Sequence, residues 1–254
     1  MFNFRSPFLF VLVLVCLFIR PAWGQSFRSV LSKLDQNYYY PQSQKLKSFS
    51  AQVKWQQLDV ASGSGKFLRN PDLVFSWDAN SDDGLGSFSL AETQEGERFR
   101  ELIHHIYPYR ELIIPLTLRQ KFSNFKGRVL KMAGDKLMLK LKPVLDSSQN
   151  YKLLIDSKKY VIRKVRFQQS VSPKNVQGEM SYLKLDGKFA ISESRSRFDV
   201  KGQKYVEVTR FNYIKVKGIW WVNWLDKTLT QDDIILQTHI FKFSNFRPIL
   251  FARQ

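Results

Sequence analysis

The sequence predicts a mostly β fold of the α+β class, built on a single large twisted antiparallel sheet with a few helices. Apolar and polar residues alternate with a period of two along most of the chain after residue 48, as in half-buried strands. Short turns such as Gly134-Asp135 and Asp186-Gly187 separate these runs and favour antiparallel neighbours over crossover helices. The 254 residues are 44% apolar and 15% aromatic, which is enough to build a core and excludes disorder.

Residues 1–24 predict a cleavable secretory signal. Arg5 precedes an apolar run over 8–19, and the small residues of Ala22-Trp23-Gly24 fit cleavage after Gly24. The run is short for a membrane-spanning helix, although an uncleaved anchor remains the alternative. Cys16, the one cysteine, lies in this run, so the predicted mature chain has no thiolate chemistry. We therefore expect residues 25–254 to form one domain in the periplasm.

The elements expected within this domain begin with a short amphipathic helix. Ser26 is a suitable N-cap, and Phe27, Val30, Leu31 and Leu34 recur at helical spacing. Residues 97–125 predict two helical pieces broken near prolines. Strands are expected at 49–58, 66–69, 73–77, 87–90, 128–132, 136–142, 151–155, 160–168, 178–185, 189–195, 205–216, 220–225 and 228–243.

The net charge of +18 is concentrated in the middle of the chain. Residues 119–166 contain 14 Lys and Arg but 3 Asp and Glu. Lys136, Lys140 and Lys142 alternate there with leucines, so one face of this strand is dry and the other basic. For an exported protein this basic face suggests an anionic membrane surface or an acidic envelope protein, not nucleic acid; a merely solubilising surface is the alternative.

Motifs of catalysis are absent from the sequence. It has no G-x-S-x-G, P-loop, H-E-x-x-H or G-x-G-x-x-G pattern. The neighbours His104 and His105 diverge on a helix and do not predict a metal site, while His239 predicts a core or edge position in a strand. Asp82-Asp83 and Asp232-Asp233 are typical of polar turns. We expect no enzyme, metal or cofactor, with a secreted hydrolase as a minor alternative.

The start of the predicted mature chain carries a recognisable order of elements. The helix and the strand 49–58 are followed by Gly63-Ser64-Gly65-Lys66-Phe67-Leu68-Arg69-Asn70-Pro71 and Leu73-Val74-Phe75-Ser76-Trp77; later, Leu141-Lys142-Pro143 precedes two paired strands. This order resembles the outer-membrane lipoprotein carrier superfamily, the LolA-like and LolB-like proteins of the periplasm, over roughly residues 26–170. The departure is Asn70, where that family usually has Arg directly before the proline.

The resemblance implies an incomplete barrel wrapped around helices, with an apolar cavity that receives acyl chains. Arg69 would take the role of the motif's basic residue. It would act as a gate by binding a helix carbonyl oxygen, or it would contact a lipid headgroup. The lipid-binding residues expected are Trp55, Phe67, Phe75, Trp77, Phe99, Leu102, Ile103, Ile106, Leu112 and Ile113. The same aromatic residues could instead fill a core.

The leading hypothesis is a periplasmic, non-enzymatic carrier or chaperone that binds the acyl chains of lipoproteins or lipids. The alternative is an envelope sensor or interaction module of the same fold, which would use its basic face to bind an acidic partner.

Overall fold

A computed structural model describes residues 26–91, 97–146 and 148–252, except for the side chains of residues 97–100. The predicted signal over residues 1–24 lies outside the described residues. The helices are α2 (Phe27–Asn37), η1 (Pro41–Ser43), α3 (Glu97–Ile106), η2 (Tyr107–Tyr109), α4 (Arg110–Ile113) and α5 (Leu118–Lys121). None of the described helices is long and apolar enough to cross a membrane.

Thirteen strands form a single antiparallel sheet that does not close, as the sequence predicts. Its order is β4-β3-β1-β13-β12-β11-β10-β9-β8-β7-β6-β5, with β2 paired to β1. The strands are β1 (Leu46–Leu58), β2 (Phe67–Arg69), β3 (Leu73–Asp78), β4 (Ser87–Leu90), β5 (Phe125–Lys131), β6 (Lys136–Pro143), β7 (Asn150–Asp156), β8 (Val161–Gln168), β9 (Asn175–Leu185), β10 (Lys188–Val200), β11 (Gln203–Val216), β12 (Ile219–Gln231) and β13 (Ile234–Leu250).

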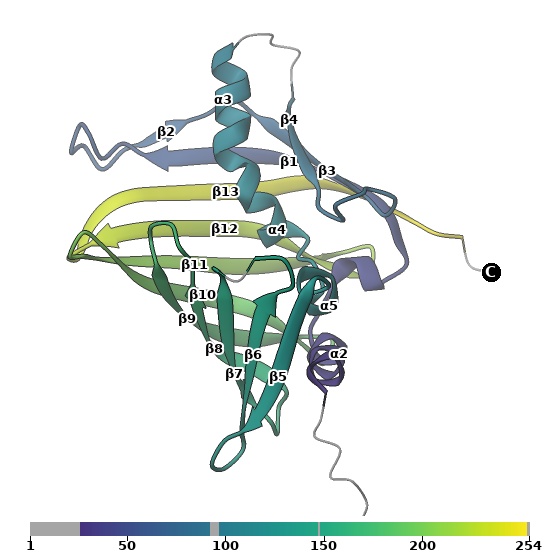
Figure 1. The fold of residues 1–254 in the computed structure, drawn as a ribbon. Coiled ribbons are helices and arrows are strands. Elements are labelled where there is room, and N and C mark those ends of the chain that lie inside the picture. Colours follow the sequence, from purple (N-terminus) through teal and green to yellow (C-terminus); the bar gives the residue numbers. More distant parts are fainter. Residues whose placement is uncertain (1–25, 92–96, 147, 253–254) are drawn as a thin grey trace, which may run out of the picture.

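The sheet curves, and the helices lie along it in two groups (Figure 1). α3 and α4 lie near the end formed by β1, β3, β4 and β13, whereas α2 and α5 lie beside β5 at the other end. From β5 to β13 each strand pairs with the next, and β13 then returns to pair with β1. This last pairing places β1, the first strand of the chain, beside β13, the last.

The first helix forms where its cap and apolar stripe predict. The Ser26 side chain accepts a hydrogen bond from the Ser29 N–H at 3.2 Å, which satisfies a free amide at the helix start. Val30, Leu31 and Leu34 are buried against the strands from β6 to β8. Gly127 allows α2 to lie close to β5, because a Cβ there would meet the Leu141 side chain at 2.5 Å and the Phe27 ring at 3.2 Å.

The last hairpin differs from its prediction. The sequence predicts strands at 220–225 and 228–243, but β12 continues to Gln231, and the chain turns at Asp232-Asp233. Both aspartates have positive φ, 46° and 68°, which suits a two-residue hairpin turn. The turn at Asp232-Asp233 is the one that the sequence predicts, whereas Asp226 and Lys227 lie within β12 and do not interrupt it.

Candidate functional site: an apolar cavity

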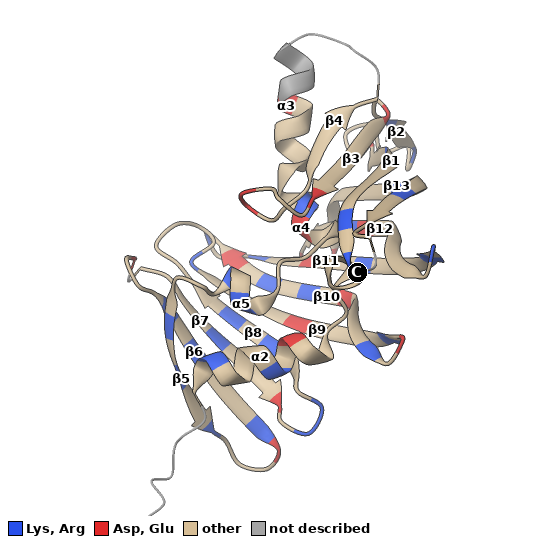
Figure 2. Cartoon of the chain, turned by 90° about the vertical axis from the view of Figure 1, so that its right-hand side faces the viewer, with Lys and Arg blue, Asp and Glu red and all other residues tan. Residues whose placement is uncertain are grey.

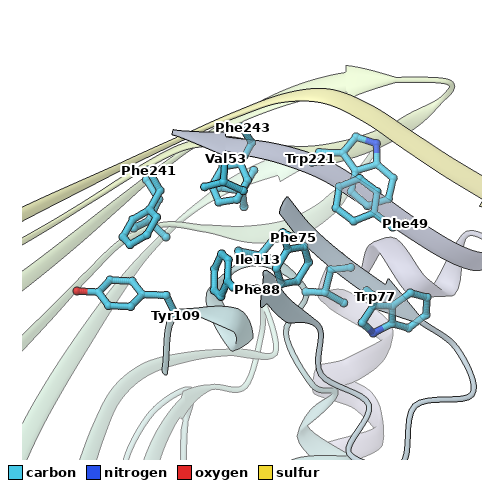
Figure 3. Packing of buried hydrophobic residues seen from close by; sticks show 14 of the residues in the cluster. Phe49, Val53, Phe75, Trp77, Phe88, Tyr109, Ile113, Trp221, Phe241 and Phe243 are labelled. Carbon is cyan, nitrogen blue, oxygen red and sulfur yellow. The ribbon is translucent and has the colours of Figure 1, made fainter. Parts of the chain in front are cut away.

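The aromatic residues predicted to bind lipid mostly lie in a filled core between α3, α4 and the neighbouring strands. Phe49 stacks on Trp221 with ring centroids 4.0 Å apart, and Phe75 meets Phe88 edge-on at 5.3 Å. Figure 3 shows these rings packed against one another. Of the predicted residues, this core buries Trp55, Phe75, Trp77, Ile106 and Ile113, and Leu102, Ile103 and Leu112 pack against it.

The remaining predicted residues lie outside this core. The Phe67 residue on β2 is 41% exposed, and the side chain of Phe99 lies outside the described residues. Arg69 is exposed and donates to the Asp72 carboxylate at 3.1 Å. It is a strand-end surface residue whose described hydrogen bonds go to Asp72 and not to a helix carbonyl.

A cavity of about 290 Å³ lies further along the sheet, between the strands from β7 to β12 and the helical segments η1, α4 and α5. It is partly open and almost entirely apolar. Leu112 and Ile113 are the residues of the predicted set that line it. The other lining residues are Tyr38, Tyr39, Tyr40, Pro41, Glu111, Pro115, Leu116, Leu118, Lys121, Phe122, Tyr151, Leu153, Ile162, Val165, Met180, Tyr182, Phe189, Ala190, Ile191, Phe211, Tyr213, Trp220 and Val222.

Tyr38 and Tyr182 form one wall of the cavity, and the protein itself uses their hydroxyl groups. The Ile162 N–H donates to the Tyr38 hydroxyl at 2.7 Å, and the Tyr182 hydroxyl donates to the Ile162 carbonyl at 2.6 Å. The two rings stack with centroids 5.6 Å apart. Burial raises the pKa of Tyr38 to about 12, so the phenol is neutral at physiological pH.

Three further tyrosines of the cavity also have hydroxyl groups that are hydrogen-bonded within the protein. The Trp220 N–H donates to the Tyr39 hydroxyl at 2.7 Å, the Tyr40 hydroxyl donates to Asp35 at 2.7 Å, and the Tyr213 hydroxyl donates to the Ile191 carbonyl at 2.8 Å. Each tyrosine therefore offers the cavity an aromatic ring with its polar atom already satisfied. These five hydroxyls therefore impose no hydrogen-bonding requirement on a ligand, whereas no described hydrogen bond involves the Tyr151 hydroxyl or the Trp220 indole N–H of the same lining.

Asp35 of α2 holds the helical side of the cavity together. Its carboxylate accepts hydrogen bonds from the Tyr40 hydroxyl, from the Leu118 N–H at 2.8 Å and from the Arg119 N–H at 3.1 Å. It thus satisfies the free amides at the start of α5 and joins that helix to α2. Burial, together with the nearby Asp35 charge, raises the pKa of Tyr40 and keeps it neutral.

Charge at the cavity is confined to one pair. Among the described lining residues, Glu111 and Lys121 carry charge, and they form a salt bridge with each other. Their paired charges leave the lining close to neutral. The arrangement can therefore accept an uncharged apolar group but has no free ion to fix a charged one.

The histidines of the described residues form no metal site. No group of three or more His, Cys, Asp or Glu among the described residues could hold a metal ion. His104 and His105 are exposed on α3, whereas His239 is buried and accepts a hydrogen bond from the Trp55 indole at 3.2 Å. Burial lowers the pKa of His239 to about 4, with further lowering by the Lys227 charge, so the ring is neutral.

The likeness of this chain to known proteins is structural and low in sequence identity. No protein-family model matches the chain, and no curated protein matches it by sequence. Similar solved structures include a LolA superfamily protein from Nitrosomonas europaea, with TM-score 0.33 and 9% identity over 90% of this chain and 95% of that one. An outer membrane lipoprotein-sorting protein domain from Vibrio parahaemolyticus has TM-score 0.33 and 10% identity over 89% of this chain and 93% of that one.

A DUF1329 family protein from Desulfovibrio piger is similar at TM-score 0.27 and 8% identity, over 88% of this chain and 92% of that one. At such low TM-scores the likeness carries no argument about function. The function is therefore inferred from the cavity.

Sequence reasoning missed most of the cavity. Tyr38-Tyr39-Tyr40-Pro41 read as the end of a helix, because three adjacent tyrosines have no helical or strand period. Their hydrogen-bonding partners lie far along the chain, with Ile162 124 positions after Tyr38. A run of large amphipathic rings directly before a proline is the one local signal that could have marked the site.

Proposed function

We propose that this protein is an exported, non-enzymatic carrier or chaperone that binds an acyl chain of a lipoprotein or lipid in the tyrosine-lined cavity. The observation that carries the proposal is a cavity whose five hydrogen-bonded tyrosine hydroxyls are already paired within the protein. A site for a polar substrate would instead present unpaired donors and acceptors to its ligand.

The size and chemistry of the cavity suit part of a hydrocarbon chain. Its volume of about 290 Å³ lies near the lower end of ligand sites, which span roughly 300–1,000 Å³. Each buried CH₂ contributes about 0.8 kcal/mol, so a short enclosed stretch of chain already gives useful affinity. Because the cavity would enclose only part of the acyl chain, transfer of that acyl chain to and from a membrane remains practicable.

The cavity also refines the predicted site. Leu112 and Ile113 would contact the chain directly, together with Leu153, Val165 and Phe189 on the strands. The aromatic residues of the filled core would stay behind this wall and contribute to stability. A role for Arg69 at a headgroup stays a prediction. The predicted signal supports a periplasmic location, and LolA and lipoprotein-sorting proteins are among the structures with a similar fold.

The test is the binding of a fluorescent fatty acid by the purified mature chain and by two matched variants. Val165→Trp places a large side chain in the cavity, whereas Val208→Trp enlarges a partly buried β11 residue that does not line it. We expect at least about a tenfold loss of affinity for the first variant, equal to 1.4 kcal/mol, and little change for the second.

Native mass spectrometry of the gently purified protein provides an independent readout, since a carrier is expected to retain lipid. Absence of co-purified lipid together with no uptake of the probe by folded wild-type protein would refute the carrier. That outcome would favour the alternative, a sensor or interaction module of the same fold.

A further inference from the structure

A row of like charges crosses the outer face of four neighbouring strands. Arg128 on β5 is opposite Lys140 on β6, Lys140 is opposite Lys152 on β7, and Lys152 is opposite Arg166 on β8. Lys126 and Lys142 form a second cross-strand pair beside this row. Neighbouring strands are about 4.8 Å apart, and like charges directly opposite one another destabilise a sheet.

None of these six basic residues forms an ion pair with a described acidic residue. The next strands differ, because Glu179 on β9 pairs with Lys164 and Arg197, and Glu193 on β10 pairs with Arg210. Ion pairs thus involve Lys164 on β8, Arg197 on β10 and Arg210 on β11, whereas the six residues named above have none among the described residues. We call the set Lys126, Arg128, Lys140, Lys142, Lys152 and Arg166 the basic row.

The basic row faces away from the helices. Leu139, Leu141 and Leu153, which alternate with its members along β6 and β7, are buried beneath α2. Lys and Arg bands run across these strands in Figure 2. Leu130, Met138 and Leu154 occupy the adjoining row on the same face and are half-buried, so apolar surface borders the charges.

We propose that the outer face of β5–β8 docks on a lipid bilayer that carries anionic headgroups. A bilayer supplies many exchangeable negative charges in a plane, which matches a broad row of one sign next to half-exposed apolar side chains. An acidic protein partner would favour individually paired and spaced charges, and it becomes an outcome of the test. The site is separate from the cavity, so this inference does not rest on the proposed function.

The experiment is sedimentation of the mature chain with two kinds of vesicle, one of phosphatidylcholine alone and one of phosphatidylcholine mixed with phosphatidylglycerol. Lys140→Glu is compared with Lys54→Glu. Lys54 is a matched control because it is exposed, lies opposite Lys242 on β13, and is eight strand positions from β6. Both changes lower the net charge equally and replace a like-charge pair with an opposite-charge pair, which favours the folded state.

We expect wild-type protein to bind the mixed vesicles and not those of phosphatidylcholine alone. Each basic residue near an anionic surface strengthens binding about fivefold, so Lys140→Glu should weaken it about 25-fold. Lys54→Glu should change it little, because charges far beyond the Debye length of about 10 Å at 0.1 M salt are screened. Val165→Trp should sediment like wild type, which separates this test from that of the cavity.

Equal losses for Lys140→Glu and Lys54→Glu would show that net charge alone matters and would overturn the proposal. Failure of wild-type protein to bind the mixed vesicles, or equal binding to both kinds, would overturn it as well. Failure to bind either kind would direct attention to an acidic protein as the partner.

Discussion

The two ends of the sheet use aromatic side chains in opposite ways. Beneath α3 and α4, rings such as Phe49 and Trp221 stack on each other and fill the space. Beside η1 and α5, Tyr38, Tyr39 and Tyr182 are anchored by backbone hydrogen bonds to the sheet, and a cavity remains between the walls. Both regions are apolar, so apolar composition alone does not distinguish a core from a binding site. What distinguishes the cavity is that the hydroxyl groups of its rings also bond to the backbone of the sheet, and that space remains between its walls.

The largest effect should come from truncating a ring in the filled core. Phe75 is fully buried between Phe49 and Phe88, so Phe75→Ala should lower the free energy of unfolding by about 3–5 kcal/mol. Val165→Ala on the cavity wall should cost much less, because the adjoining space is already empty. Urea unfolding of both variants measures the difference, and equal losses would contradict the division into filled and hollow regions.

A smaller effect should follow from removing one cavity hydroxyl. Tyr38→Phe leaves the Ile162 N–H without its partner, and a buried unsatisfied donor costs about 1–3 kcal/mol. Tyr151→Phe is the control, since no described hydrogen bond involves the Tyr151 hydroxyl, and it should be nearly neutral. Chemical denaturation with fatty-acid binding in parallel would test this. If the two variants were equally stable, the hydroxyl anchors would not support the wall.

Acid should weaken the filled region through His239. Burial lowers its pKa to about 4, below the value of about 6.5 expected in the unfolded chain, so the unfolded state binds more protons between these values. Stability therefore falls as the pH falls through this window, by at most about 2 kcal/mol between pH 7 and pH 5. The stability of His239→Gln should depend less on pH over the same range. Identical pH profiles for variant and wild type would exclude His239 as the cause.

The smallest effect is expected at Arg69, which belongs to neither region. Its ion pair with Asp72 is exposed, and such pairs contribute up to about 1 kcal/mol, often nothing measurable. Arg69→Ala should thus leave both unfolding and fatty-acid binding nearly unchanged. A clear loss of binding with unchanged stability would give Arg69 the headgroup role that the family resemblance implies.

Much of the fold followed from the residues, and much of the site did not. The Ser26 cap, the Leu/Lys alternation of β6 and the break of the helices near Pro108 are local features, and each has its expected outcome. The site depends on contacts between distant segments. The resemblance predicts all four of Leu112, Ile113, Trp55 and Trp77 at the cavity, but only the first two line it, and the two tryptophans lie in the core.

The amino-acid sequence is enough to predict a mostly β chain, the inner and outer faces of its strands, and the position of the basic block. These properties depend on side-chain periodicity and on turns within a few residues. The pairing of β13 with β1, the hydrogen bond between Tyr38 and Ile162, and the alignment of the charges on β5–β8 are visible only in the folded chain. Periodicity tells which way a side chain points, but the residue that it meets depends on how strands distant in sequence come to lie side by side.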